Sequence, residues 1–282
     1  MNLKNRTVFI TGASGFVGSN LTRALIKNDY SVHILNRSTN LSWRLKNISN
    51  RITVHIGNIT NVKSLEQALQ KTKPDYIIHL ATFGAYHYQT DLKKIIEVNI
   101  KGTKNLLEAS RNISYKCLIN TGSSSEYGRK NKPIVTLRLF SVYGPFEESK
   151  RFIPTIMKSI AFKKPINLTS ENQRHDFIFI DDVSLAYFSA LKKGSKLAGK
   201  VLNIGTGKEY TNDEIVQKLF KVTNKKTGVK KGAYIKRQWD SSHWMADISN
   251  AKKMLEWEPA YTIDKGLHTA YSWFEENIKF YK

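Results

Sequence analysis

The stretch TVFITGASGFVGSN, from Thr7 to Asn20, decides the fold. Its opening residues form an apolar, β-branched run of the kind that makes a buried strand, and a helical pattern follows from about Phe16. Gly12, Gly15 and Gly18 stand at the junction. Glycines there let the backbone approach a pyrophosphate closely, and the helix N-terminus offers it unpaired N–H groups and a positive dipole end. The stretch therefore predicts a dinucleotide-binding turn at the start of an α/β chain.

Beyond this turn, short β-branched runs alternate with amphipathic helical segments. Strands are predicted at SVHIL, ITVHI, DYIIHLA and KCLIN, and helices at VKSLEQALQKT and from about Leu92 to Ser110. This alternation is typical of a parallel sheet with helices on both faces. We therefore expect an α/β fold with a Rossmann-type doubly wound parallel sheet and a smaller C-terminal α/β lobe.

The composition bounds the class of protein. The 282 residues, 40% of them hydrophobic, suffice for one large domain or two closely joined ones. Met1 to Thr7 is polar, and no apolar run approaches the roughly 18 residues that span a bilayer. The single cysteine, Cys117, cannot form an internal disulfide, as is usual in a reducing compartment. We expect a cytoplasmic protein without a membrane partner, in which Cys117 is a small buried hydrophobe.

The net charge of +22 raises the question of an anionic partner. Positive residues are spread from Lys4 to Lys282 with only short clusters such as NKKTGVKKG, and no tract interleaves aromatics with Arg as a strand-binding groove would. We interpret most of the charge as solvated surface with a general attraction for phosphates, and expect no nucleic-acid partner. Nucleic-acid binding is the remote alternative, resting on charge alone.

Metal binding is not expected either. The seven histidines and the scattered acids show no metal-ligand spacing. His79 and His175 are expected to be packed or hydrogen-bonded, and IDDV, from Ile180 to Val183, to begin a helix.

The glycine spacing Gly-x-x-Gly-x-x-Gly resembles the extended short-chain dehydrogenase/reductase family, whose members include nucleotide-sugar epimerases, dehydratases and reductases. The resemblance covers almost the whole chain. GNIT resembles the family's adenine-contacting Gly-Asp-Ile segment, with Asn58 replacing Asp, and HLAT matches the end of strand four, beside the cofactor. VNIKGT carries the family's Asn at Asn99.

The end of strand two bears on the choice between NAD and NADP. An acid there would accept hydrogen bonds from the adenosine ribose of NAD, whereas an Arg can pair with a 2′-phosphate. This chain has Asn36, Arg37 and Ser38 and no carboxylate, so we expect NADP in preference to NAD, with a solvated loop charge as the alternative reading of Arg37. The predicted cofactor-binding residues are Gly12, Ser14, Gly15, Phe16, Val17, Gly18, Asn36, Arg37, Ser38, Asn58, Ile59, Leu80, Ala81, Thr82, Asn99, Phe140 and Val142.

The family's acid/base pair is missing. In the family a Ser or Thr precedes a Tyr-Gly, and a Tyr-x-x-x-Lys follows on a long helix, where the Tyr is the general acid/base and the Lys lowers its pKa and holds the nicotinamide ribose. TGSSSEYG supplies the first part, with Ser123 in the hydroxyl position and Ser124 as a close alternative. PIVTLRLFSVYGP resembles the strand and loop after the helix, yet only RKNK stands between Gly128 and Pro133.

No other tyrosine is a good substitute. The one Tyr-x-x-x-Lys in the chain, Tyr261 with Lys265, lies in a segment that resembles the family's C-terminal docking helix, so packing and surface charge are its expected roles. Tyr127 is a weak substitute, because the matching residue of the family is not the acid/base.

The gap is also a structural problem. A crossover between parallel strands usually needs about a dozen residues or more and normally contains a helix. Residues 122–133 can return to strand six, predicted at 134–140, but cannot form an amphipathic helix that covers the sheet. Apolar surface on strands five and six would then be exposed, at about 25 cal/mol per Å², unless another chain covers it. Several tens of residues are missing, through a natural deletion, a shortened expression form or an incomplete record.

The second half resembles the family's substrate-binding lobe. RHDFIFIDDV resembles the family's Arg-Asp-Phe-Ile segment, with His175 where many relatives have Arg and Arg174 as its stand-in. RQWD keeps the family's Arg-x-x-Asp, whose Arg can clamp a diphosphate, with a surface salt bridge as the alternative for that Arg. The predicted substrate-binding residues are Ser141, Arg174, His175, Arg237 and Asp240.

These inferences predict an NAD(P)-binding Rossmann domain at 1–145 and a mainly substrate-binding lobe at 146–282 that returns to the sheet. The resemblance implies an epimerase, dehydratase or reductase acting on a nucleotide sugar, most like the 4-keto-6-deoxy-sugar enzymes of surface-polysaccharide pathways. It also implies a homodimer, weakened or altered here. The alternative is a catalytically inactive protein that binds the dinucleotide or nucleotide sugar.

Overall fold

The computed structural model describes residues 6–84, 86, 88–122, 133–169, 173–234 and 243–281. The chain separates into two compact units. Unit 1 is Met1–Arg138 with Tyr187–Val201, and unit 2 is Leu139–Ala186 with Leu202–Lys282. The predicted domain division at 145/146 stays a prediction.

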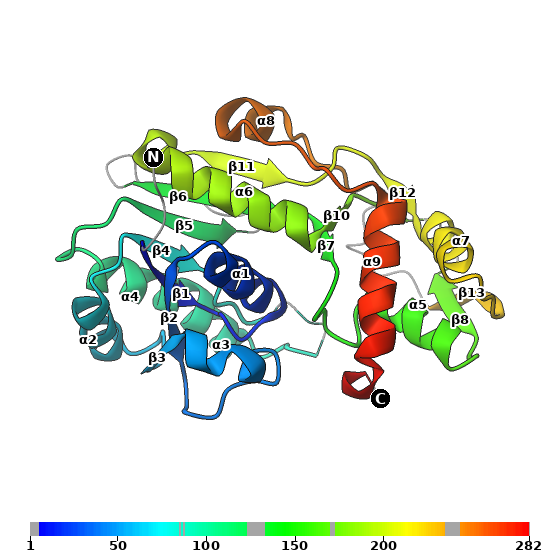
Figure 1. The fold of residues 1–282 in the computed structure, drawn as a ribbon, viewed down its shortest axis with the longest axis horizontal. Helices are drawn as coiled ribbons and strands as arrows, with labels where there is room; N and C mark the ends of the chain where they lie inside the picture. Colours follow the sequence, from blue (N-terminus) through cyan, green and yellow to red (C-terminus); the bar gives the residue numbers. More distant parts are fainter. Residues whose placement is uncertain are drawn as a thin grey trace. The chain divides into compact units, whose positions relative to one another are not determined.

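The centre of the fold is a seven-stranded sheet of order β11-β6-β5-β4-β1-β2-β3 (Figure 1). Neighbouring strands from β3 to β6 pair in parallel. The expected Rossmann-type sheet is confirmed. Its strands are β1 (Thr7–Thr11), β2 (Ser31–Asn36), β3 (Thr53–Ile56), β4 (Tyr76–His79), β5 (Cys117–Gly122), β6 (Ile134–Leu139) and β11 (Val201–Ile204).

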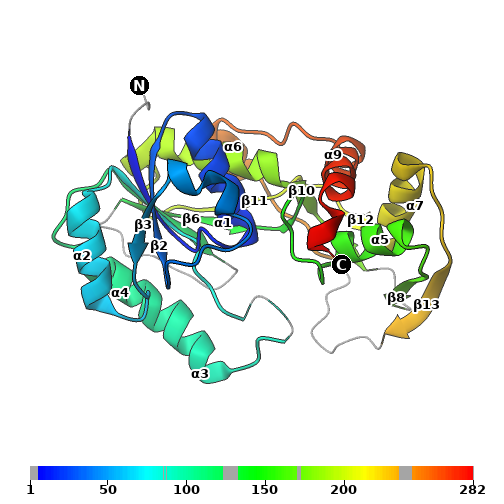
Figure 2. The ribbon, with the colours of Figure 1, turned by 60° about the horizontal axis from the view of Figure 1, so that its bottom comes forward.

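Helices cover both faces of this sheet (Figures 1 and 2). One face carries α1 (Phe16–Lys27) and α6 (Ile180–Lys193), and the other carries α2 (Val62–Thr72) and α4 (Gly102–Ala109). On the second face, α2 and α4 bury a cluster that includes Phe9, Leu69, Ile77, Leu106 and Leu118. Two 3-10 segments, η1 (Lys46–Arg51) and η3 (Gly194–Leu197), complete the unit.

The helix expected from about Leu92 to Ser110 is present but not uniform. It begins as α3 (Leu92–Ile95), passes through a π-helical segment, η2 (Ile96–Lys101), and ends as α4. Asp91 caps its start, since its carboxylate accepts a hydrogen bond from the Lys94 N–H at 3.1 Å. A π segment is rare and has no sequence signature as clear as helical periodicity, so the pattern alone predicted a plain α-helix.

Unit 2 is built from three strand pairs and a group of helices. The pairs are β7 (Ser141–Tyr143) with β10 (Phe177–Phe179), β9 (Arg174–His175) with β12 (Tyr210–Thr211), and β8 (Ile166–Thr169) with β13 (Val229–Tyr234). The helices are α5 (Phe152–Ala161), α7 (Asn212–Thr223), α8 (Ser249–Leu255), α9 (Ile263–Glu276) and η4 (Ile278–Phe280). Thr211 caps α7 in a reciprocal pair with Glu214, in which the side chain of each residue accepts a hydrogen bond from the backbone N–H of the other.

The prediction that Cys117 is a small buried hydrophobe is confirmed. Cys117 is fully buried, and burial raises the pKa of its thiol to about 12, so it behaves as a small hydrophobe. Within the described ranges, no helix has the length and apolar character needed to cross a membrane. Across those same residues, no three or more His, Cys, Asp or Glu side chains gather in a way that would hold a metal ion.

His79, at the end of β4, is buried and hydrogen-bonded on both ring nitrogens. Its Nδ1 lies 2.7 Å from the Thr11 hydroxyl and its Nε2 lies 3.0 Å from the Thr103 hydroxyl. Burial lowers the pKa of His79 to about 4, because the charged ring would lose its hydration. His79 therefore joins the sheet to the α4 helix as a neutral group.

We predict that this site makes stability depend on pH. Because the pKa of His79 is lower in the folded chain than in the unfolded one, its contribution is full above about pH 6.5 and is lost as pH falls toward about 4. This one group should cost about 2 kcal/mol between pH 7.5 and pH 5. Urea unfolding at both pH values measures the loss. His79→Gln should flatten the dependence by that amount, and an unchanged slope would contradict the prediction.

Candidate functional site

The glycine turn after β1 is built from three positions with different constraints. Gly12 has φ +77°, and a Cβ there would lie 2.5 Å from the backbone of Leu80 and Ala81. A Cβ at Gly18 would lie 2.2 Å from the carbonyl oxygen of Gly12. At Gly15, by contrast, the nearest atom would be 3.4 Å away, an ordinary contact. Gly12 and Gly18 are therefore required by the fold, whereas Gly15 leaves space in front of the helix.

The start of α1 offers its N–H groups toward that space. Gly15 is its N-cap residue, with an extended backbone, and it provides no side-chain cap. The first turn contains no acidic residue. An anion at this position would meet the unpaired N–H groups and the positive end of the helix dipole, so the turn fits a pyrophosphate.

The loop after β2 contains the residues predicted to choose between NAD and NADP. The Asn36 side chain donates to the Ser38 carbonyl oxygen at 2.6 Å, which fixes the turn. Arg37 is exposed and makes no ion pair among the described residues. The loop runs back to the glycine turn, where the Ser42 hydroxyl donates to the Ser14 carbonyl oxygen at 3.4 Å. The predicted contact of Arg37 with a 2′-phosphate stays a prediction.

Two further predicted cofactor-binding residues, Ile59 and Asn99, also make contacts that stabilise unit 1. Ile59 is buried against Gly102, and a Cβ added to Gly102 would lie 3.0 Å from the Ile59 side chain. The Ile59 carbonyl oxygen accepts a hydrogen bond from the Asn105 side-chain amide at 3.1 Å. Asn99, in the π segment, accepts from the Phe83 N–H at 2.9 Å and donates to the Phe83 carbonyl oxygen at 2.7 Å. Asn99 therefore fixes the loop after β4 beside the position of Leu80 to Thr82.

The structure brings most of the predicted cofactor residues to one edge of the unit 1 sheet. They follow the carboxyl ends of four neighbouring parallel strands, β1 to β4, which is where open α/β sheets bind ligands. Their cofactor contacts stay predictions. Phe140 and Val142 belong to unit 2. Ser123, Ser124, Tyr127, Arg237 and Asp240 lie outside the described residues.

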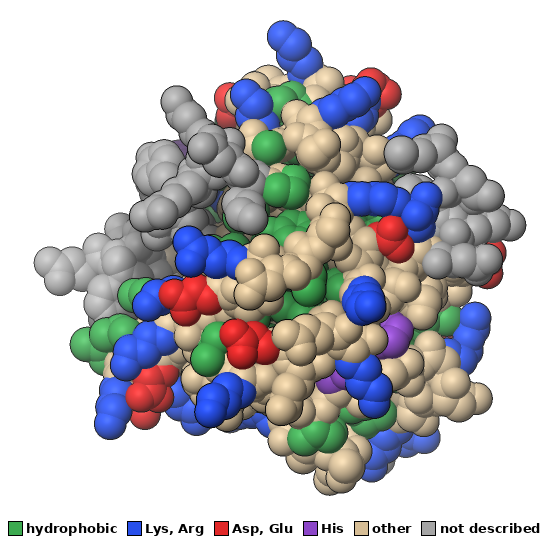
Figure 3. All heavy atoms as spheres, turned by 90° about the vertical axis from the view of Figure 1, so that its left-hand side faces the viewer, with side chains coloured by type: hydrophobic (Ala, Val, Ile, Leu, Met, Phe, Trp, Pro, Cys, Tyr) green, Lys and Arg blue, Asp and Glu red, His purple; other side chains and the backbone are tan. Residues whose placement is uncertain are grey.

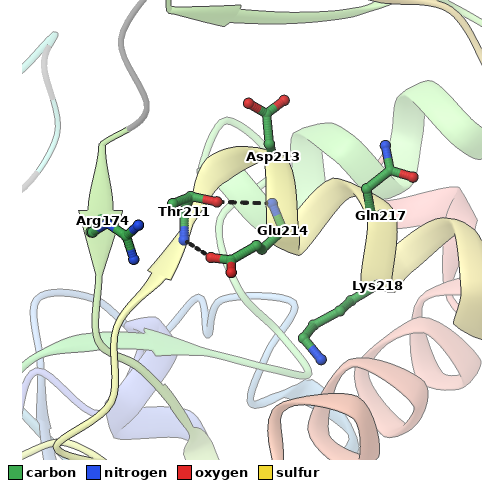
Figure 4. Close-up of a pocket in the computed structure, with 6 residues that line it drawn as sticks. All are labelled: Arg174, Thr211, Asp213, Glu214, Gln217 and Lys218. Atoms are coloured by element: carbon green, nitrogen blue, oxygen red, sulfur yellow. Dashed lines mark hydrogen bonds between the residues drawn. The ribbon is translucent and has the colours of Figure 1, made fainter.

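In unit 2, Arg174 lies beside a groove of about 420 Å³ (Figure 4). The groove is lined by Arg174, Thr211, Asp213, Glu214, Gln217 and Lys218. Glu214 is occupied with the helix cap, which lowers its pKa, and Lys218 is paired with Asp264 at 3.0 Å. Arg174 has no ion pair within the described ranges, and His175 packs edge-on against Phe177 at 5.9 Å between ring centroids.

The residue that organises this part of unit 2 is Asp176, which is fully buried. Its carboxylate accepts from the Thr206 N–H at 2.7 Å, the Thr206 hydroxyl at 2.6 Å, the Gly207 N–H at 2.8 Å and the Ala246 N–H at 3.2 Å. Its own N–H donates to the Trp244 carbonyl oxygen, and its carbonyl oxygen accepts from Ser141. Asp176 therefore fixes four chain segments, two of which carry predicted substrate residues.

Sequence reasoning did not assign Asp176 a role. The HDF segment indicates the family resemblance, but no local pattern indicates the role of Asp176, because its hydrogen-bond partners lie 30 to 70 residues away in the chain. A Cβ at Gly205 would lie 2.7 Å from the Asp176 carboxylate, so the structure requires a glycine there, but no sequence pattern indicates this contact. The paired Tyr261 and Lys265 have the expected surface character: the Lys265 ammonium lies 4.5 Å from the Tyr261 ring centroid, and the hydroxyl donates to Asp181.

Comparison with known proteins identifies the family. The model of the NAD dependent epimerase/dehydratase family matches residues 8–134 and 129–205. The chain therefore belongs to this family of nucleotide-sugar enzymes. The two matched segments overlap at residues 129–134, which end at the first residue of β6.

Individual relatives support the same assignment. UDP-glucuronate 4-epimerase of Thermodesulfobacterium geofontis is 28% identical, with 97% of each chain covered. CDP-abequose synthase of Salmonella muenchen is 26% identical, covering 93% of this chain and 96% of the relative. The structure of UDP-glucuronic acid 4-epimerase from Bacillus cereus, in complex with UDP-glucuronic acid and NAD, has a TM-score of 0.82 and 25% identity, covering 96% of this chain and 99% of that one.

We predict that Gly15→Val abolishes dinucleotide binding while the fold survives. The added side chain has room within the protein but fills the space in front of α1 that a pyrophosphate needs. Calorimetric titration with NAD and NADP measures binding, and circular dichroism reports the fold. Gly18→Val is the matched control, which should unfold the turn itself. Normal binding by Gly15→Val would mean that the turn is only structural.

We predict that Asp176→Asn destabilises the chain by about 2 kcal/mol, because the new amide places N–H groups against buried N–H donors. Urea unfolding measures the change. The control is Asp181→Asn, which alters an exposed acid of the same segment and should cost far less. An equal loss of unfolding free energy in the two variants would contradict the conclusion that Asp176 holds these chain segments together.

Proposed function

We propose that this chain is an NAD(P)-dependent enzyme that transfers a hydride between the nicotinamide and a nucleotide sugar, most like the 4-keto-6-deoxy-sugar reductases and epimerases of surface-polysaccharide biosynthesis, with its activity impaired by the loss of the catalytic Tyr/Lys helix. The observation that carries the proposal is the open Gly15 at the start of α1, in a chain whose family acts on nucleotide sugars. Likeness to both a CDP-abequose synthase and UDP-glucuronate epimerases supports the substrate class. The same proposal places the protein in the cytoplasm.

The cofactor fits the residues present. A pyrophosphate would lie against the α1 N-terminus, and Arg37 would pair with a 2′-phosphate. When bound, the nicotinamide supplies the acceptor and donor for a hydride. Asn99 would keep the loop after β4 in place along the cofactor, through its two hydrogen bonds to Phe83.

In the proposed substrate lobe, Arg174 would approach the diphosphate of the nucleotide sugar. Its guanidinium is uncommitted to any ion pair among described residues, and Asp176 holds the strand that carries it. Arg237 and Asp240 remain sequence-based candidates for diphosphate and ribose contacts, and Ser141 and His175 for the sugar side.

The proposed chemistry lacks its acid/base pair. Ser123, or Ser124, would polarise the reacting oxygen, but the sequence between Gly122 and Ile134 holds no Tyr-x-x-x-Lys. The alignment with the Thermodesulfobacterium relative runs over 320 positions and this chain has 282 residues, so several tens of aligned positions have no counterpart here. The family match consists of two parts that overlap at residues 129–134, which supports a loss at this crossover.

The second candidate function is binding without catalysis. An intact cofactor turn together with an absent acid/base pair favours it directly. Turnover separates the two candidates, because both predict dinucleotide binding and only the first predicts a product.

We predict that NADP(H) binds more tightly than NAD(H). Arg37 is exposed and free to meet a 2′-phosphate, and the loop offers no carboxylate to repel it. Titration of both reduced cofactors by nicotinamide fluorescence gives the ratio. Arg37→Ala should abolish the preference, whereas Lys63→Ala, an exposed charge elsewhere in unit 1, should not. Equal affinities in the wild-type chain would contradict the assignment of Arg37.

We predict that the chain turns over nucleotide sugars very slowly or not at all, since general acid/base catalysis typically contributes about 10² to 10⁴ in rate. Inserting a helical segment with Tyr-x-x-x-Lys between Gly128 and Arg129 should raise activity by about that factor. Nicotinamide absorbance with a panel of 4-keto-6-deoxy nucleotide sugars is the assay. A Tyr→Phe version of the inserted segment is the control. Full activity without the insert would point to Tyr127 as the acid.

A further inference from the structure

Unit 2 contains a buried carboxyl group whose hydrogen-bonding capacity is not filled. Glu147, in the loop of residues 144–151 that joins β7 to α5, is 4% exposed. Its Oε2 atom is buried and has no hydrogen-bond partner among the described residues. Burying an ionised carboxylate in such a place costs far more free energy than burying the neutral acid. The position of Glu147 therefore indicates that its carboxyl group is buried with its proton.

The groups around Glu147 do not compensate a negative charge. Burial raises the pKa of its carboxyl to about 8. This effect outweighs the charge of Arg151, at the N-cap of α5, and the backbone N–H of Gly144, which both lower the pKa. On the β7 side, Tyr143 is uncharged, because burial and nearby acids, Glu147 among them, raise the pKa of its hydroxyl. Glu147 therefore holds its proton at neutral pH while the loop is closed.

The segment after α9 closes this loop. The Tyr281 hydroxyl donates to the Glu147 backbone carbonyl oxygen at 2.9 Å, and Tyr281 is 3% exposed. In the same loop, the Phe146 ring packs on the Trp273 ring of α9 with centroids 4.6 Å apart. Tyr281 packs edge-on against Trp273 at 6.0 Å between centroids. These partners bring no charge to the carboxyl group. We call the contacts of Phe146 and Glu147 with Trp273 and Tyr281 the latch.

One backbone conformation in the loop depends on the latch. Phe146 has φ +67°, in the left-handed region that bulky residues rarely adopt. Such a conformation persists only where the surrounding contacts hold it. Here they are the Trp273 ring on one side and, on the other, the Gly144 carbonyl oxygen, which accepts from the Glu147 N–H at 3.3 Å. Once the latch is broken, the loop can relax to a more favourable backbone.

We propose that Glu147 makes the latch respond to pH: with its proton the side chain stays buried and the latch stays closed, and without it the carboxylate moves into water and the latch opens. A buried carboxylate without enough donors is too costly to keep, so loss of the proton and opening occur together. The device belongs to unit 2 and acts whether or not the chain turns over a nucleotide sugar.

Opening releases a proton, which fixes the direction of the effect. In the closed loop Glu147 keeps its proton up to about pH 8, whereas a hydrated glutamate loses it above its ordinary pKa of 4.5. Between these two limits the closed form binds one proton more than the open form. Opening therefore becomes about tenfold more favourable for each pH unit in this window, and it levels off above about pH 8.

The test measures hydrogen exchange of the full chain by mass spectrometry, in the peptides that cover residues 143–151 and 277–281. Wild type and Glu147→Gln are compared at the same pH, so the intrinsic pH dependence of amide exchange cancels. We expect the ratio of the wild-type rate to the variant rate to rise about a hundredfold between pH 5.5 and pH 7.5. Glu148→Gln, at the half-buried neighbouring acid, should exchange like wild type. Tyr281→Phe should exchange faster at every pH with the wild-type pH dependence.

Three results would overturn the proposal. The first is a ratio of wild-type to Glu147→Gln rates that stays constant with pH. The second is the same loss of pH dependence in Glu148→Gln. The third is a pH dependence that extends evenly over unit 2, which would report unfolding of the whole unit rather than opening of the latch. If Glu147→Gln does not fold, Glu147→Met provides the uncharged side chain for the same comparison.

Discussion

The backbone contact between Gly12 and the end of β4 is the constraint on which unit 1 depends. A single added carbon at Gly12 would lie 2.5 Å from the Leu80 and Ala81 backbone, and one at Gly18 would lie 2.2 Å from Gly12 itself. With that approach possible, β1 pairs with β4, the turn closes and α1 begins at Phe16. The turn closed by Gly12 and Gly18 also leaves the space at Gly15 free. The same close backbone contact therefore determines both the fold of unit 1 and the expected position of the cofactor.

Charge has a more diffuse role. Figure 3 shows Lys and Arg side chains scattered over the face that it presents, with Asp and Glu among them. Several lysines are paired, as Lys116 is with Asp75 and Lys225 with Glu275. Exposed pairs of this kind contribute little stability, about 0 to 1 kcal/mol each. A net charge of +22 distributed in this way attracts phosphate-bearing molecules in general. It does not indicate which ligand the protein binds.

The sequence predicted the sheet and its first turn because strands, glycines and helix starts are local signals. Thr7 to Thr11, Phe16 and the cap at Thr211 all lie where periodicity and capping chemistry indicate. The π segment at Ile96–Lys101 and the hub at Asp176 were not predictable, since one depends on packing around Asn99 and the other on partners up to 70 residues away. The predicted catalytic residues, Ser123 and Ser124, lie outside the described ranges. The prediction of impaired catalysis rests on the absence of a Tyr-x-x-x-Lys motif between Gly122 and Ile134.

The π segment determines which side chains of the following helix, α4, face the sheet. A π turn accommodates one residue more than an α turn, so it acts as an insertion absorbed inside a continuous helix. Asn99 sits within that turn and faces Phe83, while Thr103 and Leu106, one turn later, meet His79 and the core. Loss of a single residue there would restore an ordinary helix and rotate α4 by about 100° relative to α3. The helix could then keep the contact of Asn99 with the Phe83 loop or the contacts of Thr103 and Leu106 with the sheet, but not both. The number of residues in this helix is therefore as strictly constrained as their identity.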